Sequence, residues 1–328
     1  MRARRGDGTG GSRVDAPTVV LLGGFGRSGT TLLERLLSNC SDAVAVGEVI
    51  HVWERGLAAN ESCGCGRPLR ECEVWREVGA RGFGGWSRLD ERHVLKLRRE
   101  VCVNRKIPLL LARRLDPRFT AAAREYAGIL ERFYGAVADV AGTHVLVDSS
   151  KHPSYAYLLR LARVRTRVVL VVRDSRGVAF SWAKHVQRPE VTRGVAYMPK
   201  YSVLGSALRW TAYNVLFLLL RLTGQPLLVL RYEQLIQDPA GEVERVLRFA
   251  GATADGARLR ELATGRVELG VDHTVAGNPM RMRTGEIVLK LDEQWRGAMA
   301  PAQRRLVTLV TLPLQFLFGY QTWRRRRR

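Results

Sequence analysis

The feature that most constrains the fold is a glycine-containing loop between an apolar run and a helical pattern. Residues 24–31 read GFGRSGTT, after VVLL and before LLERLL. Gly24 and Gly29 have the spacing of the glycines in the phosphate-binding loop G-x-x-x-x-G-K-[ST]. However, Thr30 stands at the lysine position, and the basic residue Arg27 lies inside the loop. This pattern predicts a strand–loop–helix unit that binds a phosphate-like group other than the end of a triphosphate.

The chemistry of this loop follows from its backbone and its one charge. The glycines let the chain turn tightly around an oxyanion, and the N–H groups of Ser28 to Thr31 point at that anion from a helix N-terminus. Arg27 adds planar donors for an oxygen that gains charge as a bond breaks. Walker-type ATPases need a lysine on the β- and γ-phosphates, which is missing here. A 5′-phosphate that carries one further small anionic group fits better.

The rest of the chain alternates short apolar runs with amphipathic segments and has no internal repeat. This alternation indicates a parallel sheet covered by helices on both faces. We predict an α/β protein, a P-loop-like three-layer α/β/α fold with a central parallel sheet and ligands at the carboxyl ends of the strands. Strands are predicted at residues 19–23, 43–47, 143–148, 167–173 and 226–231. Helices are predicted at residues 30–38, 90–114, 120–140, 155–163, 176–185, 203–223 and 240–250 and at the C-terminal end.

We predict a single domain over residues 18–323, with an irregular, Gly- and Cys-rich insertion at about residues 56–87. Residues 1–17 are basic and Gly-rich and lack an apolar run, which is typical of a disordered leader and not of a signal peptide. Residues 324–328 are a run of five arginines that forms a basic tail. Residues 270–285 show no periodicity and are predicted to form a late loop.

Lys and Arg number 53 and Asp and Glu number 31, so the net charge is +22. This balance favours anionic partners such as nucleotides, nucleic acid, sulfated or phosphorylated sugars or an acidic membrane, although an Arg-rich solvated surface gives the same balance. No stretch reaches the roughly 18 unbroken apolar residues of a membrane span, and residues 306–320 are predicted to form a buried helix. We expect a cytoplasmic protein that binds no nucleic acid and whose arginine tail can touch an anionic membrane.

A second segment pairs an arginine with a serine at the end of a predicted strand. Residues 168–185 read VVLVVRDSRGVAFSWAKH; the strand ends at Arg173, and Asp174 can cap the following helix. Ser181 lies eight residues after Arg173, about two helical turns along. The charge of Arg173 and the hydroxyl of Ser181 suit a second phosphate monoester, with a salt-bridged strand end as the plainer alternative.

With these two segments in order, the chain resembles the sulfotransferase family that uses 3′-phosphoadenosine-5′-phosphosulfate (PAPS). In that family the first segment holds the 5′-phosphosulfate and the second holds the 3′-phosphate. Similar segments run from about Thr18 to Tyr320: VGEV, VDSSKHP, LVLRYEQLIQDP and HTVAGNPMRMRTGEIVLKLDEQW. Arginine at position 27, where many cytosolic members have lysine, resembles bacterial members and the tyrosylprotein and carbohydrate sulfotransferase branch.

The resemblance implies that PAPS is the co-substrate and that no metal is required. Arg27 would contact the bridging oxygen and the sulfuryl group, Lys151 would lie at the leaving group, and Glu48 would act as general base. Glu48 also lies at the end of a predicted strand, from which its carboxylate can face the same crevice as Arg27. The residues implied in cofactor binding are Arg27, Ser28, Gly29, Thr30, Thr31, Arg173, Ser181, Tyr232, Arg281 and Arg283.

Several alternatives stay open. His51 is the rival general base, and Lys151 could be a solvated surface lysine. Asp148 could act as the Mg²⁺-binding acid of a P-loop kinase or NTPase that uses ATP, and a non-catalytic anion-binding protein is a third possibility. The sequence leaves the oligomeric state open, and it leaves the acceptor open among a carbohydrate, a lipid, a phenol and a tyrosine.

Three cysteines, Cys63, Cys65 and Cys72, form the pattern C-G-C-G followed by a further cysteine within the insertion. Three thiolates are one ligand short of a closed zinc site, and the usual CxxC spacing is missing. Cys40 or His51 could supply a fourth ligand. We favour a structural loop, reduced or with one disulfide, over a metal site. Because the insertion follows Glu48 in the chain, we expect it to shape the acceptor pocket.

Overall fold

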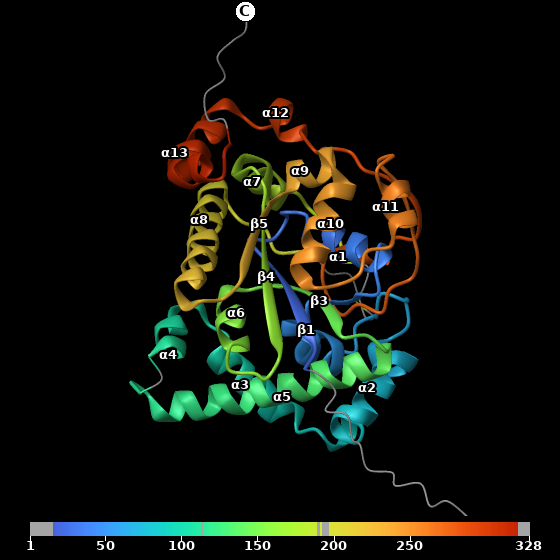
Figure 1. Ribbon diagram of the computed structural model, residues 1–328. Coiled ribbons are helices and arrows are strands. Elements are labelled where there is room, and N and C mark those ends of the chain that lie inside the picture. Colours follow the sequence, from blue (N-terminus) through green and yellow to red (C-terminus); the bar gives the residue numbers. More distant parts are fainter. Residues whose placement is uncertain (1–15, 113, 189–190, 192–196, 321–328) are drawn as a thin grey trace, which may run out of the picture.

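A computed structural model describes residues 16–112, 114–188, 191 and 197–320 (Figure 1). The predicted basic tail and all but the last two residues of the predicted leader lie outside this part of the chain. Those two predictions, and the outer limits of the predicted domain, therefore stay predictions.

The centre of the described chain is a sheet of five parallel strands in the order β2-β3-β1-β4-β5. Each strand lies close to its predicted position, and the carboxyl ends all meet at one edge because the strands are parallel. The pairing of β1 with β3 shifts register after Leu21, and the pairing of β2 with β3 shifts after Ala45. Both shifts mark a bulge near the carboxyl end of β3. The strands are β1 (Thr18–Gly23), β2 (Val44–Gly47), β3 (Val145–Lys151), β4 (Arg165–Val172) and β5 (Leu227–Arg231).

Helices cover both faces of this sheet, as Figure 1 shows. Successive residues of β1 alternate between the faces: Val19 and Leu21 pack into one core, and Val20 and Leu22 into the other. The first core is closed by α5 (Pro117–Ala141), α6 (Pro153–Leu159) and α8 (Val203–Leu220). The second is closed by α1 (Thr30–Asn39), α10 (Pro239–Ala250) and α11 (Gly256–Leu262). The predicted three-layer α/β/α fold is confirmed.

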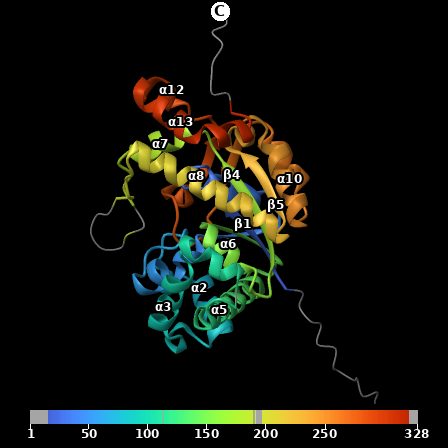
Figure 2. The same ribbon diagram turned by 90° about the vertical axis from the view of Figure 1, so that its left-hand side faces the viewer.

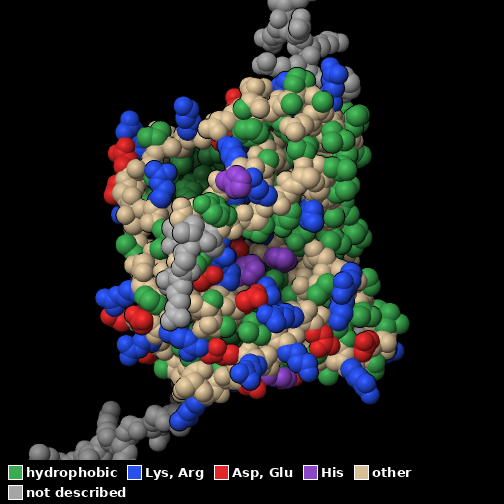
Figure 3. All heavy atoms as spheres, turned by 180° about the vertical axis from the view of Figure 1, so that it is seen from behind, with side chains coloured by type: hydrophobic (Ala, Val, Ile, Leu, Met, Phe, Trp, Pro, Cys, Tyr) green, Lys and Arg blue, Asp and Glu red, His purple; other side chains and the backbone are tan. Residues whose placement is uncertain are grey.

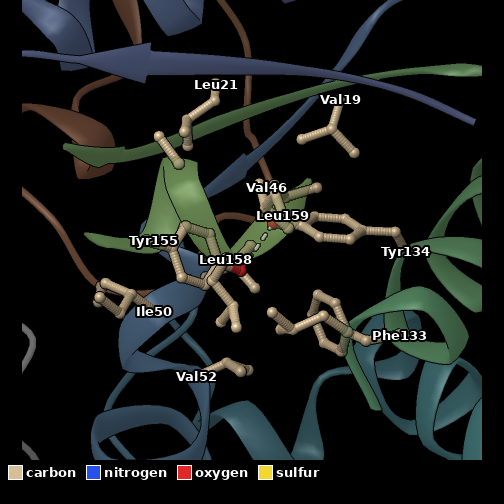
Figure 4. Close-up of a cluster of buried hydrophobic side chains, with 14 of the residues drawn as sticks. Val19, Leu21, Val46, Ile50, Val52, Phe133, Tyr134, Tyr155, Leu158 and Leu159 are labelled. Atoms are coloured by element: carbon tan, nitrogen blue, oxygen red, sulfur yellow. Dashed lines mark hydrogen bonds between the residues drawn. The ribbon is translucent and has the colours of Figure 1, made fainter. Parts of the chain in front are cut away.

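Aromatic side chains fill the first core where α5 and α6 meet the sheet (Figure 4). Phe133 and Tyr134 of α5 and Tyr155 of α6 lie against the apolar side chains of β1 and of the chain after β2. The Tyr134 hydroxyl donates a short hydrogen bond to Asp148 at 2.5 Å and contacts the Tyr155 hydroxyl at 2.8 Å. These three buried polar side chains are therefore paired with one another, as is usual for buried polar groups.

The predicted insertion is more regular than its sequence indicates. It contains a π-helical turn over Val52–Ala58 and the helix α2 (Glu73–Phe83), and it packs with α3 (Glu91–Val101) against α5 (Figure 2). The helix predicted at residues 90–114 is wrong as a single element, because Val103 is extended and α4 (Ile107–Leu111) begins afresh with a proline in its first turn. In the interior of one continuous helix Pro108 could not donate to the carbonyl of residue 104 and its ring would clash with that carbonyl, whereas the first turn of a new helix tolerates proline.

The C-terminal part carries short elements that the sequence did not predict. An antiparallel pair, β6 (Arg266–Leu269) and β7 (Gly285–Val288), brackets the late loop. Each strand has only four residues, too few for an alternating pattern to stand out. The remaining helices are α7 (Ser175–Ala183), α9 (Tyr232–Gln237), α12 (Gln294–Ala298) and α13 (Pro301–Leu317).

One described helix with the turn after it, Val203–Thr223, is long and apolar enough to cross a membrane by length and composition alone, with a mean hydropathy of 1.4. Its Trp210, Phe217 and Leu220 are fully buried in the protein, so it has the contacts of a core helix. The neighbouring α13 is only partly the buried helix that we predicted. Val307 and Leu314 of α13 are buried, whereas other apolar side chains of this helix are exposed.

Candidate active site

The carboxyl ends of β1, β3 and β4 meet around a cavity of about 550 Å³. The surface is hollowed on this side, and basic, acidic and histidine side chains lie beside one another in the hollow (Figure 3). The structure brings most of the predicted site residues to its wall, although they come from segments far apart in the sequence. These residues are Arg27, Gly29, Thr30, Thr31, Glu48, Lys151, Arg173, Ser181 and Tyr232.

The loop between β1 and α1 depends on its glycines. Gly24 has φ of 125°, and a Cβ there would lie 2.4 Å from the Val171 carbonyl oxygen. Gly29 has φ of 92°, and a Cβ there would lie 2.6 Å from the ring of Tyr232. Ser28 is buried and its hydroxyl donates to the Phe25 carbonyl at 2.7 Å. The Ser28 side chain therefore shapes the loop, and the contribution that we predicted for it falls to its backbone.

Arg27 is held in a strained and partly unsatisfied state. Its φ of 72° lies in the left-handed region, which non-glycine residues rarely occupy. Its guanidinium lies over the ring of Trp182, 5.0 Å from the centroid, and contacts the Met198 sulfur at 3.0 Å. Its Nε is buried and has no hydrogen-bond partner among the described residues. Burial lowers the pKa of Arg27, and the nearby Glu48 carboxylate opposes this shift. A buried cation with a spare donor can donate to an anion that enters the cavity.

Glu48 and Lys151 form an ion pair through a short contact between Nζ and Oε1. Lys151 ends β3 just after the bulge, with φ of 64°, so strain and bulge together set the direction of its side chain. Burial alone would raise the pKa of Glu48, but the Lys151 ammonium, with help from His51 and Arg55, more than offsets this and lowers that pKa to about 2. Glu48 is therefore an ionised carboxylate whose charge is neutralised by the ion pair with Lys151.

The rival base lies beside this pair. His51 Nε2 is 3.6 Å from Glu48 Oε2, and the Arg98 guanidinium contacts its other ring nitrogen at 3.3 Å. Burial lowers the pKa of His51 to about 3 and that of His152 to about 4, against the opposing effect of Glu48. Both imidazoles are therefore neutral at physiological pH, and both line the cavity.

A buried carboxyl that sequence reasoning missed supports this group from behind. Glu34 of α1 accepts hydrogen bonds from the Gly47 N–H at 2.6 Å and from the Ser149 hydroxyl at 2.8 Å. Burial raises the pKa of Glu34 to about 8, so it is largely protonated at neutral pH. Because Gly47 precedes Glu48 and Ser149 precedes the bulge before Lys151, Glu34 positions both halves of the ion pair. Its only signal in the sequence is a lone acid inside an apolar helix face.

The second predicted cluster adjoins the first. Arg173 Nη1 donates to the Arg27 carbonyl at 3.2 Å, which links the two segments directly. Its Nη2 binds the Asp292 carboxylate at 3.0 Å, and its guanidinium lies over the Tyr232 ring at 4.7 Å. The Asp174 carboxylate accepts from the Arg176 N–H, so the predicted helix cap is confirmed.

Other predicted residues lie outside the cavity wall. Arg281 is only 2% exposed and donates to the carbonyls of Thr274 and Ser62 at 2.7 and 2.6 Å. Arg283 is exposed on the surface. Neither arginine lines the cavity, so their role in cofactor binding stays a prediction. Asp148 is fully buried and accepts from the Tyr134 hydroxyl in the first core, so it has no access to a nucleotide in the cavity.

Sequence reasoning missed several residues that complete the wall of the cavity. Arg55 and Arg188 both line the cavity and both pair with Glu61, at 2.8 and 2.7 Å. A continuous row of rings forms another part of the wall, with centroid separations of 4.7 to 6.2 Å between neighbours. The row runs through His51, His152, Tyr213, Phe25, Trp182 and Tyr201.

The late loop closes the site from the side of β2. The N–H of Glu48 donates to the Val275 carbonyl at 2.8 Å, and the Val275 N–H donates to Val46 at 3.0 Å. A Cβ at Gly47 would lie 2.1 Å from the Val275 oxygen, so glycine is needed for this approach. The buried Arg35 of α1 holds the other end of the loop through the Asp272 carboxylate at 2.8 Å and the carbonyls of Gly270, Met280 and Arg283.

Comparison with known proteins identifies the family. The sequence model of the family described as "Sulfotransferase family" matches residues 17–256, well over half of the chain. The chain belongs to the sulfotransferase family. No curated protein sequence matches it significantly.

Solved structures add to this at the level of the fold. The sulfotransferase domain from the curacin biosynthetic pathway superposes with a TM-score of 0.52 at 16% identity, over 94% of this chain and 99% of that chain. The sulfotransferase domain from the Synechococcus PCC 7002 olefin synthase gives 0.46 at 18% identity, over 94% and 97%. The sulfotransferase STF1 from Mycobacterium tuberculosis H37Rv gives 0.40 at 15% identity, over 76% and 72%.

Family membership makes the protein a sulfotransferase enzyme. The P-loop kinase or NTPase alternative is not favoured, because the family match stands against it and the buried Asp148 cannot serve a nucleotide-bound metal ion. The recognised family is therefore the one that the RSGTT and VVRDSRGVAFS segments resemble.

Proposed function

We propose that the protein transfers a sulfuryl group from PAPS to a hydroxyl of an acceptor. The observation that carries this proposal is the junction of two anion-binding clusters on one cavity. The loop around Arg27 and the pair Arg173 and Ser181 line the same wall, linked by the hydrogen bond between Arg173 and the Arg27 carbonyl. A nucleotide with an anionic group at each end of its ribose matches this pair of sites.

In this proposal the loop N–H groups of Ser28 to Thr31 bind the 5′-phosphosulfate and Arg173 and Ser181 bind the 3′-phosphate. Tyr232 packs beside them. The spare Nε donor of Arg27 turns to the sulfuryl oxygens or the bridging oxygen. The acceptor oxygen attacks sulfur in line, an oxygen–sulfur bond forms, and the bond to the bridging oxygen breaks to release adenosine 3′,5′-bisphosphate. Positioning and charge stabilisation supply the catalysis.

The Glu48–Lys151 ion pair gives the reaction an order. Lys151 neutralises Glu48 in the ligand-free protein, which keeps that carboxylate a weak base. When donor phosphates enter, Lys151 has a stronger anionic partner at the leaving oxygen. Glu48 is then freed from its partner and its pKa rises, so it can take the proton of the acceptor hydroxyl. The base is thus activated only when the donor is bound.

The row of rings supports an acceptor with an apolar or ring-shaped surface beside its hydroxyl. Phe25, Trp182, Tyr201 and Tyr213 offer faces on which a phenol, a sugar ring or a lipid can pack. Arg55, just before the insertion, lines the same cavity and pairs with Glu61 of the insertion, so the insertion can shape the acceptor pocket through this arginine. We also propose that the enzyme works in the cytoplasm, where PAPS is available to it, and that it binds no nucleic acid.

A ligand panel tests the donor. We expect adenosine 3′,5′-bisphosphate to raise the melting temperature and ATP with Mg²⁺ or heparin to have little effect. Labelled sulfate from PAPS should then appear in a product formed in a cell extract, which identifies the acceptor. Stabilisation by ATP with Mg²⁺ alone would overturn the proposal in favour of a kinase or NTPase. Stabilisation by heparin alone would favour a non-catalytic anion-binding protein.

A further inference from the structure

Three cysteines and one histidine converge outside the active-site cavity. Cys63, Cys65 and Cys72 come from the insertion, and His273 comes from the late loop, about two hundred residues farther along the chain. The three sulfurs and one ring nitrogen of His273 all lie within 4.8 Å of one another. Cys63 and Cys72 are buried, and Cys65 and His273 are half-buried. None of these four residues lines the cavity described above.

The separations match the edges of a tetrahedral zinc site. With Zn–S of about 2.3 Å and Zn–N of about 2.05 Å, tetrahedral angles require about 3.8 Å between two sulfurs and about 3.6 Å between sulfur and nitrogen. Cys65 Sγ lies 3.8 Å from Cys72 Sγ. His273 Nδ1 lies 3.8 Å from Cys63 Sγ and 3.2 Å from Cys72 Sγ. Four groups of the type that zinc prefers therefore lie within 4.8 Å of one another, and the three separations above are close to the edges of a tetrahedral zinc site.

A disulfide does not account for the same arrangement. A disulfide needs two sulfurs at about 2.05 Å, whereas the cysteines here are free and Cys65 and Cys72 are 3.8 Å apart. A disulfide between two of the cysteines would also not explain why the third cysteine and His273 lie beside them. The sequence pointed to Cys40 or His51 as the fourth ligand, but His51 faces the cavity and Cys40, just after α1, packs in the other core.

We propose that Cys63, Cys65, Cys72 and His273 bind one structural zinc ion, which joins the insertion to the late loop. All four positions are filled by protein groups, which is the composition of a structural Cys₃His site with no open position for a substrate. This proposal departs from our preference for a metal-free loop, and it places the metal away from the reacting groups. The proposal does not rest on the PAPS reaction.

The backbone around the cysteines is folded for such a site. Gly66 has φ of 86° and turns the chain so that Cys63 N–H bonds to the Arg67 carbonyl at 2.8 Å. The N–H of Gly64 donates to the Thr274 carbonyl at 2.9 Å, and a Cβ on Gly64 would lie 2.3 Å from the Asp272 oxygen. Glycine between the first two cysteines therefore lets the His273 segment come close enough to contribute its ligand.

Neighbouring groups complete the second layer of the site. Backbone N–H groups of Cys65 and Trp75 donate to the sulfurs of Cys63 and Cys72. Cys72 also precedes α2, whose N-terminal N–H groups favour a thiolate. Three thiolates, one neutral imidazole and Zn²⁺ carry a net charge of −1. The buried Arg281, bound to the carbonyls of Ser62 and Thr274, stands next to this charge and offsets it.

The proposed zinc acts on the active site through the late loop. His273 is two residues before Val275, whose carbonyl accepts from the Glu48 N–H at 2.8 Å. A Cβ on Gly277 would lie 3.5 Å from Glu48 Oε1, so the same loop touches the carboxylate itself. Fixing His273 therefore fixes the backbone that holds Glu48, and the zinc ligands are positioning residues for the site.

The direct test is the metal content of the purified full-length protein, measured by mass spectrometry without added metal. We expect close to one zinc per chain. Cys72→Ser and His273→Ala should retain less than about a tenth of that zinc, because each removes a ligand from a closed site. Cys102→Ser and His144→Ala are matched controls outside the cluster and should keep full occupancy. Equal zinc in the cluster variants and the controls would overturn the proposal.

A second set of measurements uses the wild-type protein, so it tests the proposal even if the cluster variants fail to fold. Wild-type protein refolded with Co²⁺ should show the intense visible absorption of tetrahedral cobalt with thiolate ligands, and added Zn²⁺ should bleach it. A chelator should expose three further thiols to a thiol reagent and lower the melting temperature by several degrees. A metal-free wild type, a wild type with a disulfide between cluster cysteines, or a cobalt spectrum without thiolate bands would each overturn the assignment.

Discussion

At the residue scale, the site depends on charges that already have partners before any ligand binds. Lys151 is paired with Glu48, and Arg173 is paired with Asp292, whose pKa that arginine lowers against the opposing effect of burial. Arg27 differs, because its buried Nε has no partner among the described residues. In the proposed reaction, binding of the nucleotide exchanges two existing ion pairs for contacts with its phosphates and gives the free Nε of Arg27 a partner.

The first prediction concerns the base. Glu48→Gln keeps the shape of the side chain but removes its basicity, so turnover should fall by about 10²- to 10⁴-fold in a labelled-sulfate assay. Affinity for adenosine 3′,5′-bisphosphate should stay equal or increase, because Lys151 no longer has an ionised partner. Glu244→Gln, exposed on α10 and away from the cavity, is the control. If His51→Asn abolishes turnover while Glu48→Gln keeps it, His51 is the base.

The second prediction concerns the 3′-phosphate. Arg173→Ala should weaken binding of adenosine 3′,5′-bisphosphate by about 10- to 100-fold in calorimetry, since a charge-assisted hydrogen bond contributes about 1.5–3 kcal/mol. Affinity for AMP, which lacks the 3′-phosphate, should change far less. Arg283→Ala tests the exposed late-loop arginine in parallel. Equal losses for both nucleotides in Arg173→Ala would show that this side chain holds the loop through Arg27 instead.

At the element scale, α1 and the late loop organise the site through buried polar side chains. Glu34 holds the ends of β2 and β3, and Arg35 holds the late loop. When burial raises the pKa of an acid, the free energy of unfolding falls as pH rises, because the unfolded chain releases the proton at lower pH than the folded chain. For Glu34 this loss of stability is absent below pH 4.5, which is the ordinary pKa of the group. It grows up to about pH 8 and is constant above it.

The third prediction follows from that sign. Glu34→Gln keeps both hydrogen bonds without an ionisable proton, so it should be more stable than wild type at neutral pH. The difference should grow by about 1.4 kcal/mol per pH unit and reach on the order of 3 kcal/mol at pH 7. Urea unfolding at pH 5 and pH 7 measures it, with the exposed Glu77→Gln as control. A difference that does not change with pH would contradict a protonated Glu34.

Elements with strong local patterns were predictable from the sequence, and elements held by distant contacts were not. β1, its loop and α1 were predicted because Gly24, Gly29 and the flanking apolar runs all lie within twenty residues. Arg281 lies in the late loop, where we predicted arginines that bind the cofactor, yet its guanidinium donates to the carbonyls of Ser62 and Thr274. His273 joins the cysteine cluster from two hundred residues away. Neither partnership has a local signature, since sequence distance does not report which backbone oxygens end up buried.

At the scale of the whole molecule, exposed apolar side chains gather on two adjacent helices. α8 and α13 pack together, and most of the large exposed apolar side chains of the described chain lie on them or on the turn after α8. On α8 and its turn these are Leu204, Leu208, Val215, Leu219 and Leu222, and on α13 they are Leu306, Leu309, Phe316 and Leu317. Exposed apolar side chains gathered on two packed helices are a candidate binding surface.

The chemistry around this surface favours an anionic membrane. The net charge is +22, and five arginines follow shortly after α13 in the sequence. Near a membrane with anionic lipids each arginine contributes about 1 kcal/mol, so the tail alone adds on the order of 5 kcal/mol at most. We therefore propose that α8, α13 and the tail bind such a surface together, with the apolar side chains at the headgroup level.

The last prediction tests this surface with vesicles. The full-length protein should sediment with vesicles that contain phosphatidylglycerol but not with vesicles of phosphatidylcholine alone, and binding should weaken as salt rises from 0.05 to 0.5 M, roughly the range over which screening becomes strong. Leu208→Ser with Phe316→Ser should reduce binding at every salt concentration, because these exposed side chains supply the apolar part. Replacing Arg324 to Arg328 with serine should remove the salt dependence. Binding that both variants retain in full would mean that another basic face of the protein is responsible, while equal binding to neutral vesicles would rule out an electrostatic contribution.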